Sequence, residues 1–257
     1  NMLQYRISDG TILAATHGRG FWTTQAPASA PFVRFGSSYN YSKINTESSF
    51  TTVGCRSYRD YTLPMLIDAA PTGDAVVTIN IASGNATEGV DYDITTNGNF
   101  TSPSKQLTFP NGQDIDRTIT IRVYDDAELE NQESFTLTYS IGGGTTAVPS
   151  TTSTSYTFYI GDNDLAPVSG TTLVETTVNA ATATEVRTNG TFYFYNPVGG
   201  RVMNSIQNAA APLGCVTTTI VEAGNVWQSF LNGNRSQKVF EITTASNPGT
   251  NYSLGFY

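Results

Sequence analysis

The stretch Tyr124–Phe135, YDDAELENQESF, decides the fold together with the runs on either side of it. In both runs every second residue is apolar; these residues are Ile119, Ile121 and Val123 before the stretch and Phe135, Leu137 and Tyr139 after it. A period of two is typical of β-strands with one buried face. The sequence therefore predicts two strands that are joined by an acidic loop.

That loop holds five carboxylates in nine residues, Asp125, Asp126, Glu128, Glu130 and Glu133, with no Lys, Arg or His among them. Like charges a few ångströms apart repel one another unless protons or a cation intervene. Calcium takes about 6 to 8 oxygen ligands in a flexible geometry, so a dense set of carboxylates suits it. The alternative is that these acids keep a loop soluble and protect strand edges.

Composition narrows the class of protein. The chain has 257 residues, enough for two domains, and 13 % of them are charged, against ~25 % in a typical soluble domain. A net charge of -8 argues against a nucleic-acid partner, which would need clustered basic residues. No run of 18 apolar residues is present, so we expect no membrane insertion. These features favour an extracellular all-β protein, and nothing in them calls for more than a monomer.

Runs of β-branched and aromatic residues between Gly, Asn, Asp and Pro mark the expected strands. They cover 32–41, 48–53, 58–67, 75–82, 105–109, 117–124, 134–141 and 154–161, then 171–178, 191–196, 201–207, 215–222, 237–243 and 251–257. Short strands at this spacing predict two consecutive immunoglobulin-like, Greek-key β-sandwich domains, 32–165 and 166–257. The linker APASAP, residues 26–31, precedes the first of them.

Residues 1–25 contain DGTILAATHGRGFW, which resembles the closing blade of a β-propeller of the sialidase-like or sortilin-like kind. A single blade needs neighbours to bury its faces. The resemblance therefore implies a short β remnant of an upstream propeller. His17, the only histidine, is expected to be a loop residue rather than a catalytic one.

Four spaced motifs resemble those of the Calx-beta domain, an immunoglobulin-like sandwich found in sodium/calcium exchangers and many bacterial surface proteins. They are ATEGVDY at 86–92, PNGQ at 110–113, the acidic loop, and DND at 162–164. The resemblance extends over residues 32–164 and implies a calcium site. The implied ligands are Asp91, Asp125, Asp126, Glu130, Glu133, Asp162 and Asp164, with Glu128 acting through its backbone carbonyl and Glu47 as a further candidate.

In a Greek-key sandwich the Asp125 loop, the Asp91 turn and the Asp162 strand end can meet at one pole. Two positions depart from the family pattern. Ala127 stands where the tightest-binding exchanger domains have an acid, and Asn163 lies in the middle of the last triplet. Fewer charged oxygens imply weaker binding or fewer ions, because affinity follows ligand charge.

The C-terminal region resembles a β-sandwich module that recurs near the C-termini of large secreted Bacteroidetes proteins, a resemblance that implies no activity. It rests on TFYFYNP, LGCVTTTIVEAG and NYSLGFY. The four aromatics Phe192–Tyr195 place two side chains on each face of a strand. One pair is expected in the core; the other is either exposed, where it could stack on sugar rings, or covered by an interface. Tyr193, Tyr195 and Trp227 are the candidate ligand contacts.

Catalysis has little support in the sequence. The chain has no G-x-S-x-G, H-E-x-x-H or P-loop motif and one histidine. A carboxylate pair for glycoside hydrolysis stays open in any acidic protein. Cys55 and Cys215 leave two alternatives, a single bridge between the domains or two small buried side chains.

The sequence thus favours a non-catalytic, calcium-binding structural or adhesion region of a secreted or cell-surface bacterial protein. Calcium would stiffen the acidic loop and the junction that follows Asp164. The alternative is a module that binds an extracellular glycan or a surface protein through the C-terminal sandwich. Part of a glycoside hydrolase ranks below both.

Overall fold

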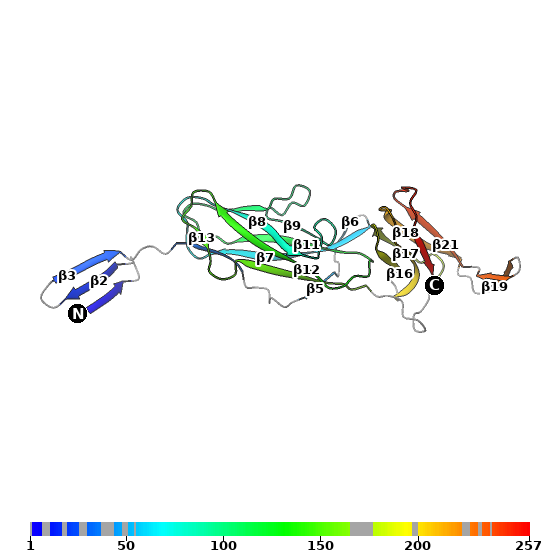
Figure 1. Cartoon of the computed structure of the whole chain (residues 1–257), viewed down its shortest axis with the longest axis horizontal. Coiled ribbons are helices and arrows are strands. Elements are labelled where there is room, and N and C mark those ends of the chain that lie inside the picture. Colours follow the sequence, from blue (N-terminus) through cyan, green and yellow to red (C-terminus); the bar gives the residue numbers. More distant parts are fainter. Residues whose placement is uncertain are drawn as a thin grey trace.

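The computed structural model describes residues 2–6, 11–16, 20–25, 30–36, 44–47, 51–53, 55–164, 177–196, 200–222, 227–230, 233–236 and 238–257. The regular elements within these ranges are all β-strands. Figure 1 shows them arranged as successive units along one long axis. In this described part of the chain, no helix has the length and apolarity needed to cross a membrane.

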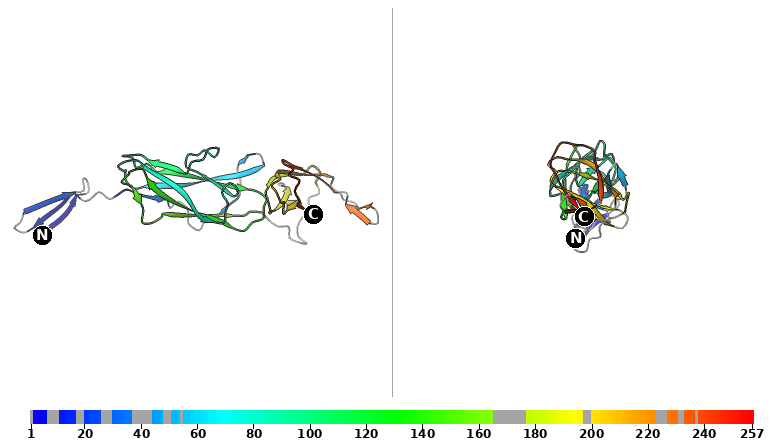
Figure 2. Two further views of the ribbon diagram at one scale, coloured as in Figure 1. Left: turned by 45° about the horizontal axis from the view of Figure 1, so that its top comes forward. Right: turned by 90° about the vertical axis from the view of Figure 1, so that its right-hand side faces the viewer.

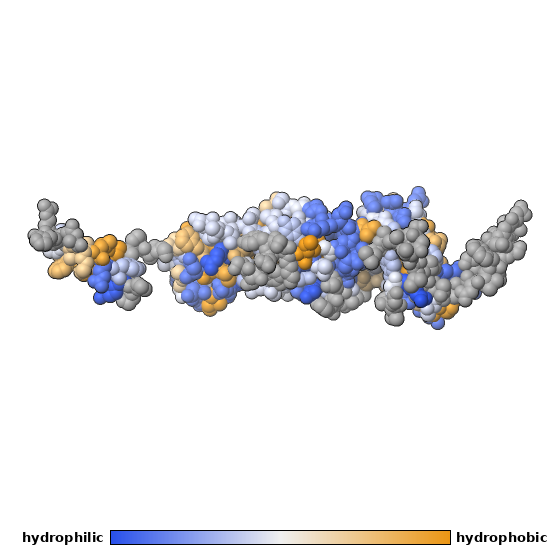
Figure 3. All heavy atoms as spheres, turned by 90° about the horizontal axis from the view of Figure 1, so that it is seen from below, coloured by the Kyte–Doolittle hydropathy of each residue, from blue (hydrophilic) through white to orange (hydrophobic). Residues whose placement is uncertain are grey.

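The first unit is a three-stranded antiparallel sheet of β1 (Met2–Arg6), β2 (Thr11–Thr16) and β3 (Gly20–Gln25). Its apolar residues are largely uncovered; Leu3 is 76 % exposed and Phe21 75 %. Apolar residues are visible on this sheet at the left of Figure 3. The residues that resemble a propeller blade therefore form strands. His17, the predicted loop residue, lies outside the described residues.

Two sheets form the first sandwich. One has the order β10-β8-β12-β14-β5 and the other β13-β4-β7-β11-β9, with β6 paired to β7. The strands of the first sheet are β5 (Ile44–Thr46), β8 (Ala75–Gly84), β10 (Gln106–Phe109), β12 (Glu133–Gly142) and β14 (Ser155–Gly161). Those of the second are β4 (Phe32–Phe35), β6 (Thr51–Val53), β7 (Arg56–Ile67), β9 (Tyr92–Thr95), β11 (Arg117–Asp125) and β13 (Val148–Pro149).

The core of this sandwich confirms the alternation that the sequence predicts. Ile119, Ile121 and Val123 on β11 are at most 1 % exposed, and Phe135 and Leu137 on β12 are fully buried. The Phe135 ring stacks on Tyr92 of the opposite sheet, with centroids 3.6 Å apart, and on Phe158 at 5.3 Å. Tyr139 is only partly buried, and its hydroxyl donates to the Val33 carbonyl.

The second sandwich packs the sheet β15-β18-β21 against the sheet β16-β17-β22. Its strands are β15 (Ala181–Val186), β16 (Thr191–Asn196), β17 (Arg201–Gln207), β18 (Gly214–Glu222), β21 (Val239–Thr244) and β22 (Ser253–Phe256). Phe192, Phe194, Val216 and Ile220 lie in its core. A hairpin of β19 (Trp227–Phe230) and β20 (Gly233–Ser236) pairs by itself.

The structure corrects several predicted strands. Within the strand expected at 32–41, β4 ends at Phe35 and residues 37–41 lie outside the described part. Thr177 and Val178 are not in a strand, whereas the unpredicted β15 begins at Ala181. Residues 171–176 lie outside the described part. The short strands β5 and β9 are also unpredicted; their three and four residues are too few for periodicity to reveal.

The two sandwiches follow each other end to end, as the left view of Figure 2 shows, and they project onto one another when seen along the long axis in the right view. Each has a separate core. The all-β, double-sandwich fold expected from the sequence is therefore what the chain adopts. The acidic loop between β11 and β12 lies at the pole of the first sandwich that meets the second.

Candidate metal centre at the sandwich junction

Strand ends of the first sandwich place the acidic residues at one pole. β11 ends at Asp125 and β12 begins at Glu133, so the acidic loop spans this pole. β14 and β5 end directly before Asp162 and Glu47. Asp91 immediately precedes β9, which pairs with β11. Figure 3 shows hydrophilic residues gathered on this part of the molecule.

Glu47, Asp162 and Asp164 form one cluster, which we call the Glu47 group. A carboxylate oxygen from each lies within 4.8 Å of the other two. The strands β5 and β14 are parallel, and the Glu47 N–H donates to the Gly161 carbonyl at 3.1 Å, which brings these acids together. The N–H groups of Glu130 and Asp164 donate to the two oxygens of Asp162 at 2.7 and 2.6 Å. Backbone donors therefore hold Asp162 in place.

Two carboxylates of the Glu47 group have buried oxygens that no hydrogen bond satisfies. Glu47 is 4 % exposed and its Oε2 has no partner, and the Oδ2 of Asp164 is also buried without one. Burial, followed by the Asp126 charge, raises the pKa of Glu47 to about 10. Burial, followed by the Asp162 charge, raises the pKa of Asp164 to about 8. Carboxylates in such surroundings require a proton or a cation.

Asp91, Glu130 and Glu133 form a second cluster, which we call the Asp91 group. Their oxygens again lie within 4.8 Å of one another. Asp91 is 5 % exposed, and its Oδ2 accepts from the Thr87 N–H at 2.6 Å. Burial is the main cause that raises the pKa of Glu130 and of Glu133 to about 8, and neighbouring carboxylates, Asp126 for Glu130 and Asp91 for Glu133, are the next.

One cation from the second sandwich, Arg187, enters this pole, and it is not among the residues predicted from the sequence. The Nη2 atom of Arg187 lies 2.8 Å from Asp126, 2.9 Å from Glu128 and 3.9 Å from both Asp91 and Glu130. Arg187 directly follows β15. A sequence signal does exist, because Arg187 is the only Lys or Arg between Arg122 and Arg201. Its partner, however, could not be read from that spacing.

Three predicted ligands belong to neither group: Asp126 and Glu128 contact Arg187, and Asp125 contacts Asn163. The side chain of Asp126 is 9 % exposed, accepts from the Glu128 N–H through Oδ1 at 2.7 Å, and faces Arg187 through Oδ2. Burial raises its pKa, and the Arg187 charge opposes that shift. Asp125 lies outside both groups and accepts from the Asn163 side chain at 2.9 Å. Glu128, expected to act through its carbonyl, directs its carboxylate to Arg187.

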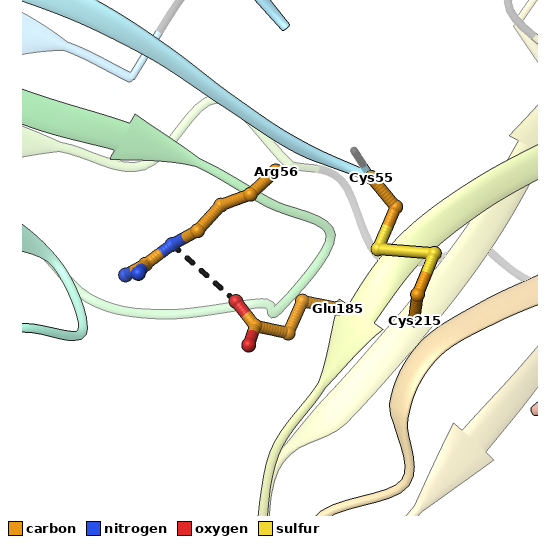
Figure 4. The surroundings of a disulfide bond; sticks show 4 residues. All are labelled: Cys55, Arg56, Glu185 and Cys215. Carbon is orange, nitrogen blue, oxygen red and sulfur yellow. Dashed lines mark ion pairs between the residues drawn. A yellow bond between two sulfur atoms is a disulfide. The ribbon is translucent and has the colours of Figure 1, made fainter. Parts of the chain in front are cut away.

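A disulfide and an ion pair join the two sandwiches beside the acidic pole (Figure 4). Cys55 and Cys215 are bonded, with Cα atoms 5.8 Å apart, so the bridge is the correct one of the two alternatives. Arg56 Nε lies 3.3 Å from Glu185 Oε2, and its guanidinium covers the Tyr124 ring at 3.3 Å. Glu185 and Cys215 are direct partners in the β15–β18 pair, so both links reach the same sheet.

Backbone hydrogen bonds also attach the acidic loop to the second sandwich. The Leu129 N–H donates to the Thr191 carbonyl at 3.0 Å, and the Tyr193 N–H donates to the Ala127 carbonyl at 2.9 Å. Residues 127–129 thereby pair with the edge strand β16 through a single antiparallel bridge. The loop that carries most of the carboxylates is thus fixed from both sandwiches.

The four consecutive aromatic side chains on β16 alternate between the two faces of the strand, as predicted. Phe192 and Phe194 are buried in the core, while Tyr193 and Tyr195 are half-buried on the other face. The Tyr193 ring lies 6.5 Å from both the Tyr195 and the Tyr257 rings, measured between centroids. The third predicted ligand contact, the Trp227 side chain, lies outside the described part of the structure.

A small cavity of about 240 Å³ lies where this tyrosine face meets the acidic pole. It is lined by Asn163, Asp164, Tyr195 and Gly200. One wall therefore belongs to the Glu47 group and the other to the aromatic strand. The three predicted contacts thus differ: Tyr195 lines the cavity and Tyr193 lies beside Tyr195, while Trp227 is not placed.

Residues 65–164 match the Calx-beta domain family. This Calx-beta segment includes all the predicted calcium ligands except Glu47, and it excludes Arg187. No curated protein matches the chain.

Solved structures of Calx domains also match. The apo-form Calx CBD1 domain is 20 % identical with a TM-score of 0.35, covering 52 % of this chain and 99 % of that one. The CBD12 from CALX1.2 is 16 % identical with a TM-score of 0.34, covering 77 % and 67 %. The calcium binding domain CBD12 of CALX1.1 is 16 % identical with a TM-score of 0.37, covering 87 % and 74 %. Likenesses this low carry no assignment of function.

Proposed function

We propose that this chain binds calcium through the Glu47 group and that the ion helps to hold the two sandwiches as one stiff, non-catalytic unit. The observation that carries the proposal is the buried Oε2 atom of Glu47, which has no partner. A buried charge without a partner is strongly unfavourable. A divalent ion among Glu47, Asp162 and Asp164 would neutralise it, and carboxylate oxygens are the ligands that calcium prefers.

The residues present fit a calcium ion. Glu47 and Asp164 each offer a buried oxygen without a hydrogen bond, and the backbone already holds Asp162. Calcium would supply charge neutralisation here, and no chemical reaction is involved. The Calx-beta match over residues 65–164 supports this proposal.

The proposed mechanical role follows from where the ion would lie. Asp164 is the last described residue before the second sandwich resumes at residue 177. Glu130, whose N–H binds Asp162, belongs to the loop that pairs with β16. An ion in the Glu47 group would therefore restrain both Asp164, at the end of the first sandwich, and the acidic loop that pairs with β16. Such restraint is what a spacer in an adhesive or structural protein requires.

We further propose a secreted or cell-surface location in a bacterium. The disulfide between Cys55 and Cys215 supports it, because disulfides persist in oxidising compartments. The low content of charged residues also supports it. Protease treatment of intact cells tests the location: loss of the protein from intact, unlysed cells is expected, and protection until lysis contradicts it.

Calcium titration of chelator-treated protein by calorimetry tests the binding. The double variant Glu47→Gln with Asp164→Asn is expected to abolish the binding heat, while the exposed control Glu241→Gln keeps it. Small-angle scattering with calcium and with chelator then tests the stiffness. Absence of heat in the unmodified protein at millimolar calcium would refute calcium binding, and an unchanged scattering profile would refute the mechanical role.

A second candidate function is a binding module for an extracellular glycan or a surface protein. The cavity beside Tyr195 favours it, because an aromatic face next to carboxylate and amide groups suits a sugar ring. Glycan-array binding that disappears in Tyr195→Ala, and not in the exposed control Tyr252→Ala, would establish it. Trp227→Ala belongs in the same series. Equal binding by all variants would place the contact elsewhere.

A further inference from the structure

Arg187 is fixed by its own sandwich before it reaches the acidic pole. The preceding residue, Val186, accepts from the Leu213 N–H at 3.0 Å. Two residues later, Asn189 has a φ of 64° and donates its N–H to the Ala209 carbonyl at 3.0 Å. Hydrogen bonds therefore hold the turn that carries Arg187 on both sides, and this fixes the position from which the side chain extends.

The guanidinium occupies the position of a cation among four carboxylates. Its Nη2 contacts Asp126 and Glu128 at 2.8 and 2.9 Å, and Asp91 and Glu130 of the Asp91 group lie at 3.9 Å. Its Nη1 donates to the Val90 carbonyl at 3.4 Å. The side chain is 16 % exposed. Arginine keeps its charge at every physiological pH, so this cation is permanent.

As a result, the negative charge of the Asp91 group is partly neutralised by the protein, and that of the Glu47 group is not. Among the described residues, no Lys or Arg forms an ion pair with Glu47, Asp162 or Asp164, whereas Arg187 is within 4.0 Å of two members of the Asp91 group. Buried oxygens without a hydrogen-bond partner occur in both groups, on Glu47 and Asp164 in the first and on Glu133 in the second, so the difference between the groups lies in the cation. One group therefore has a resident cation supplied by the protein, and the other has none.

We propose that Arg187 determines how many calcium ions the pole accepts: its guanidinium fills the place of a metal at the Asp91 group and confines calcium to the Glu47 group. The inference rests on the proposed calcium binding. The second sandwich then helps to set the number of calcium ions bound, because Arg187 belongs to that sandwich and the carboxylates belong to the first. Metal stoichiometry is then set by the junction and not by the acidic loop alone.

The test is the number of calcium ions bound per chain, measured by equilibrium dialysis and elemental analysis on the full 257-residue protein. Arg187→Gln is expected to bind one ion more than the unmodified protein. Arg187→Lys keeps the charge and is expected to bind the same number as the unmodified protein. Arg122→Gln is the matched control, because it removes an arginine whose ion pair, with Asp60, involves none of the acids of either group.

The difference between Arg187→Gln and the unmodified protein decides the inference separately from the proposed function. Equal stoichiometry in the two proteins overturns it, and so does the same gain in Arg122→Gln. If the unmodified protein binds no ion, the proposed function fails, yet a single ion gained by Arg187→Gln still supports the exclusion by Arg187. Should Arg187→Gln unfold in chelator, calcium is expected to restore its circular dichroism, and failure to do so counts against the inference.

Discussion

Cys55 is bonded to Cys215, which lies 160 positions later in the chain, and this bond joins the start of β7 to the sheet β15-β18-β21. The ion pair between Arg56 and Glu185 lies next to it. The disulfide and the ion pair thus link the two sandwiches beside the acidic pole, and the acidic loop makes a separate link by pairing with β16. The junction is held at several separate points.

Removal of the bridge should weaken the junction. Cys55→Ser with Cys215→Ser is expected to lower stability by about 2 to 5 kcal/mol, because the closed loop is long. Differential scanning calorimetry checks this. Reductant should shift the unmodified protein to the melting temperature of the double variant and leave the variant unchanged. Identical melting of oxidised protein and variant would contradict the prediction.

Calcium should reverse the effect of a substitution at Glu47. In chelator at neutral pH, Glu47→Gln is expected to be more stable than the unmodified protein by about 1 to 3 kcal/mol, because a carboxyl whose pKa is raised to about 10 must bind a proton on folding, whereas the amide is neutral already and can donate to neighbouring carboxylates. In millimolar calcium the order should invert, since a ligand is lost. Urea unfolding under both conditions measures the change. The same sign in both would exclude Glu47 as a ligand.

The aromatic stack under the pole should be essential to the first sandwich. Phe135→Ala is expected to cost about 3 to 5 kcal/mol, because the fully buried ring packs on both Tyr92 and Phe158. Phe256→Ala, at a side chain that is 57 % exposed, should change stability by less than about 1 kcal/mol. Thermal melts of both variants provide the comparison. Similar losses for the two would show that burial does not set the cost.

A methyl group at Gly190 should disturb the Arg187–Glu128 contact without touching any member of the Glu47 group. A Cβ atom there would lie 2.1 Å from Glu128 Oε1 and 2.7 Å from Phe192 Cε2. Gly190→Ala is therefore expected to displace the Glu128 carboxylate and to cost about 1 to 3 kcal/mol.

Hydrogen exchange gives the local measurement for Gly190→Ala. The amides of Leu129 and Tyr193 should exchange faster, because they close the loop pairing with β16. Gly142→Ala is the control, since its Cβ would meet only the Val76 carbonyl, at 4.0 Å. Unchanged exchange at both amides would mean that the Glu128 carboxylate adapts without moving the loop.

The alternation around the acidic loop predicted the first sandwich well. Ile119, Ile121 and Phe135 are buried as their spacing requires, because a strand places successive side chains on opposite faces whatever surrounds it. The same rule separated Phe192 and Phe194 from Tyr193 and Tyr195. Short elements such as β5 escaped prediction because three residues carry no period, although β5 places Glu47 beside Asp162.

The sequence by itself determined the strands that flank the acidic loop and the concentration of carboxylates between them, since both are properties of neighbouring residues. Only the tertiary structure decided that the acids divide into the Glu47 group and the Asp91 group, and that Arg187 neutralises one of them. Electrostatic interaction depends on distance in space. Those distances arise from the parallel pairing of β5 with β14 and from the turn after β15, and they cannot be read from positions along the chain.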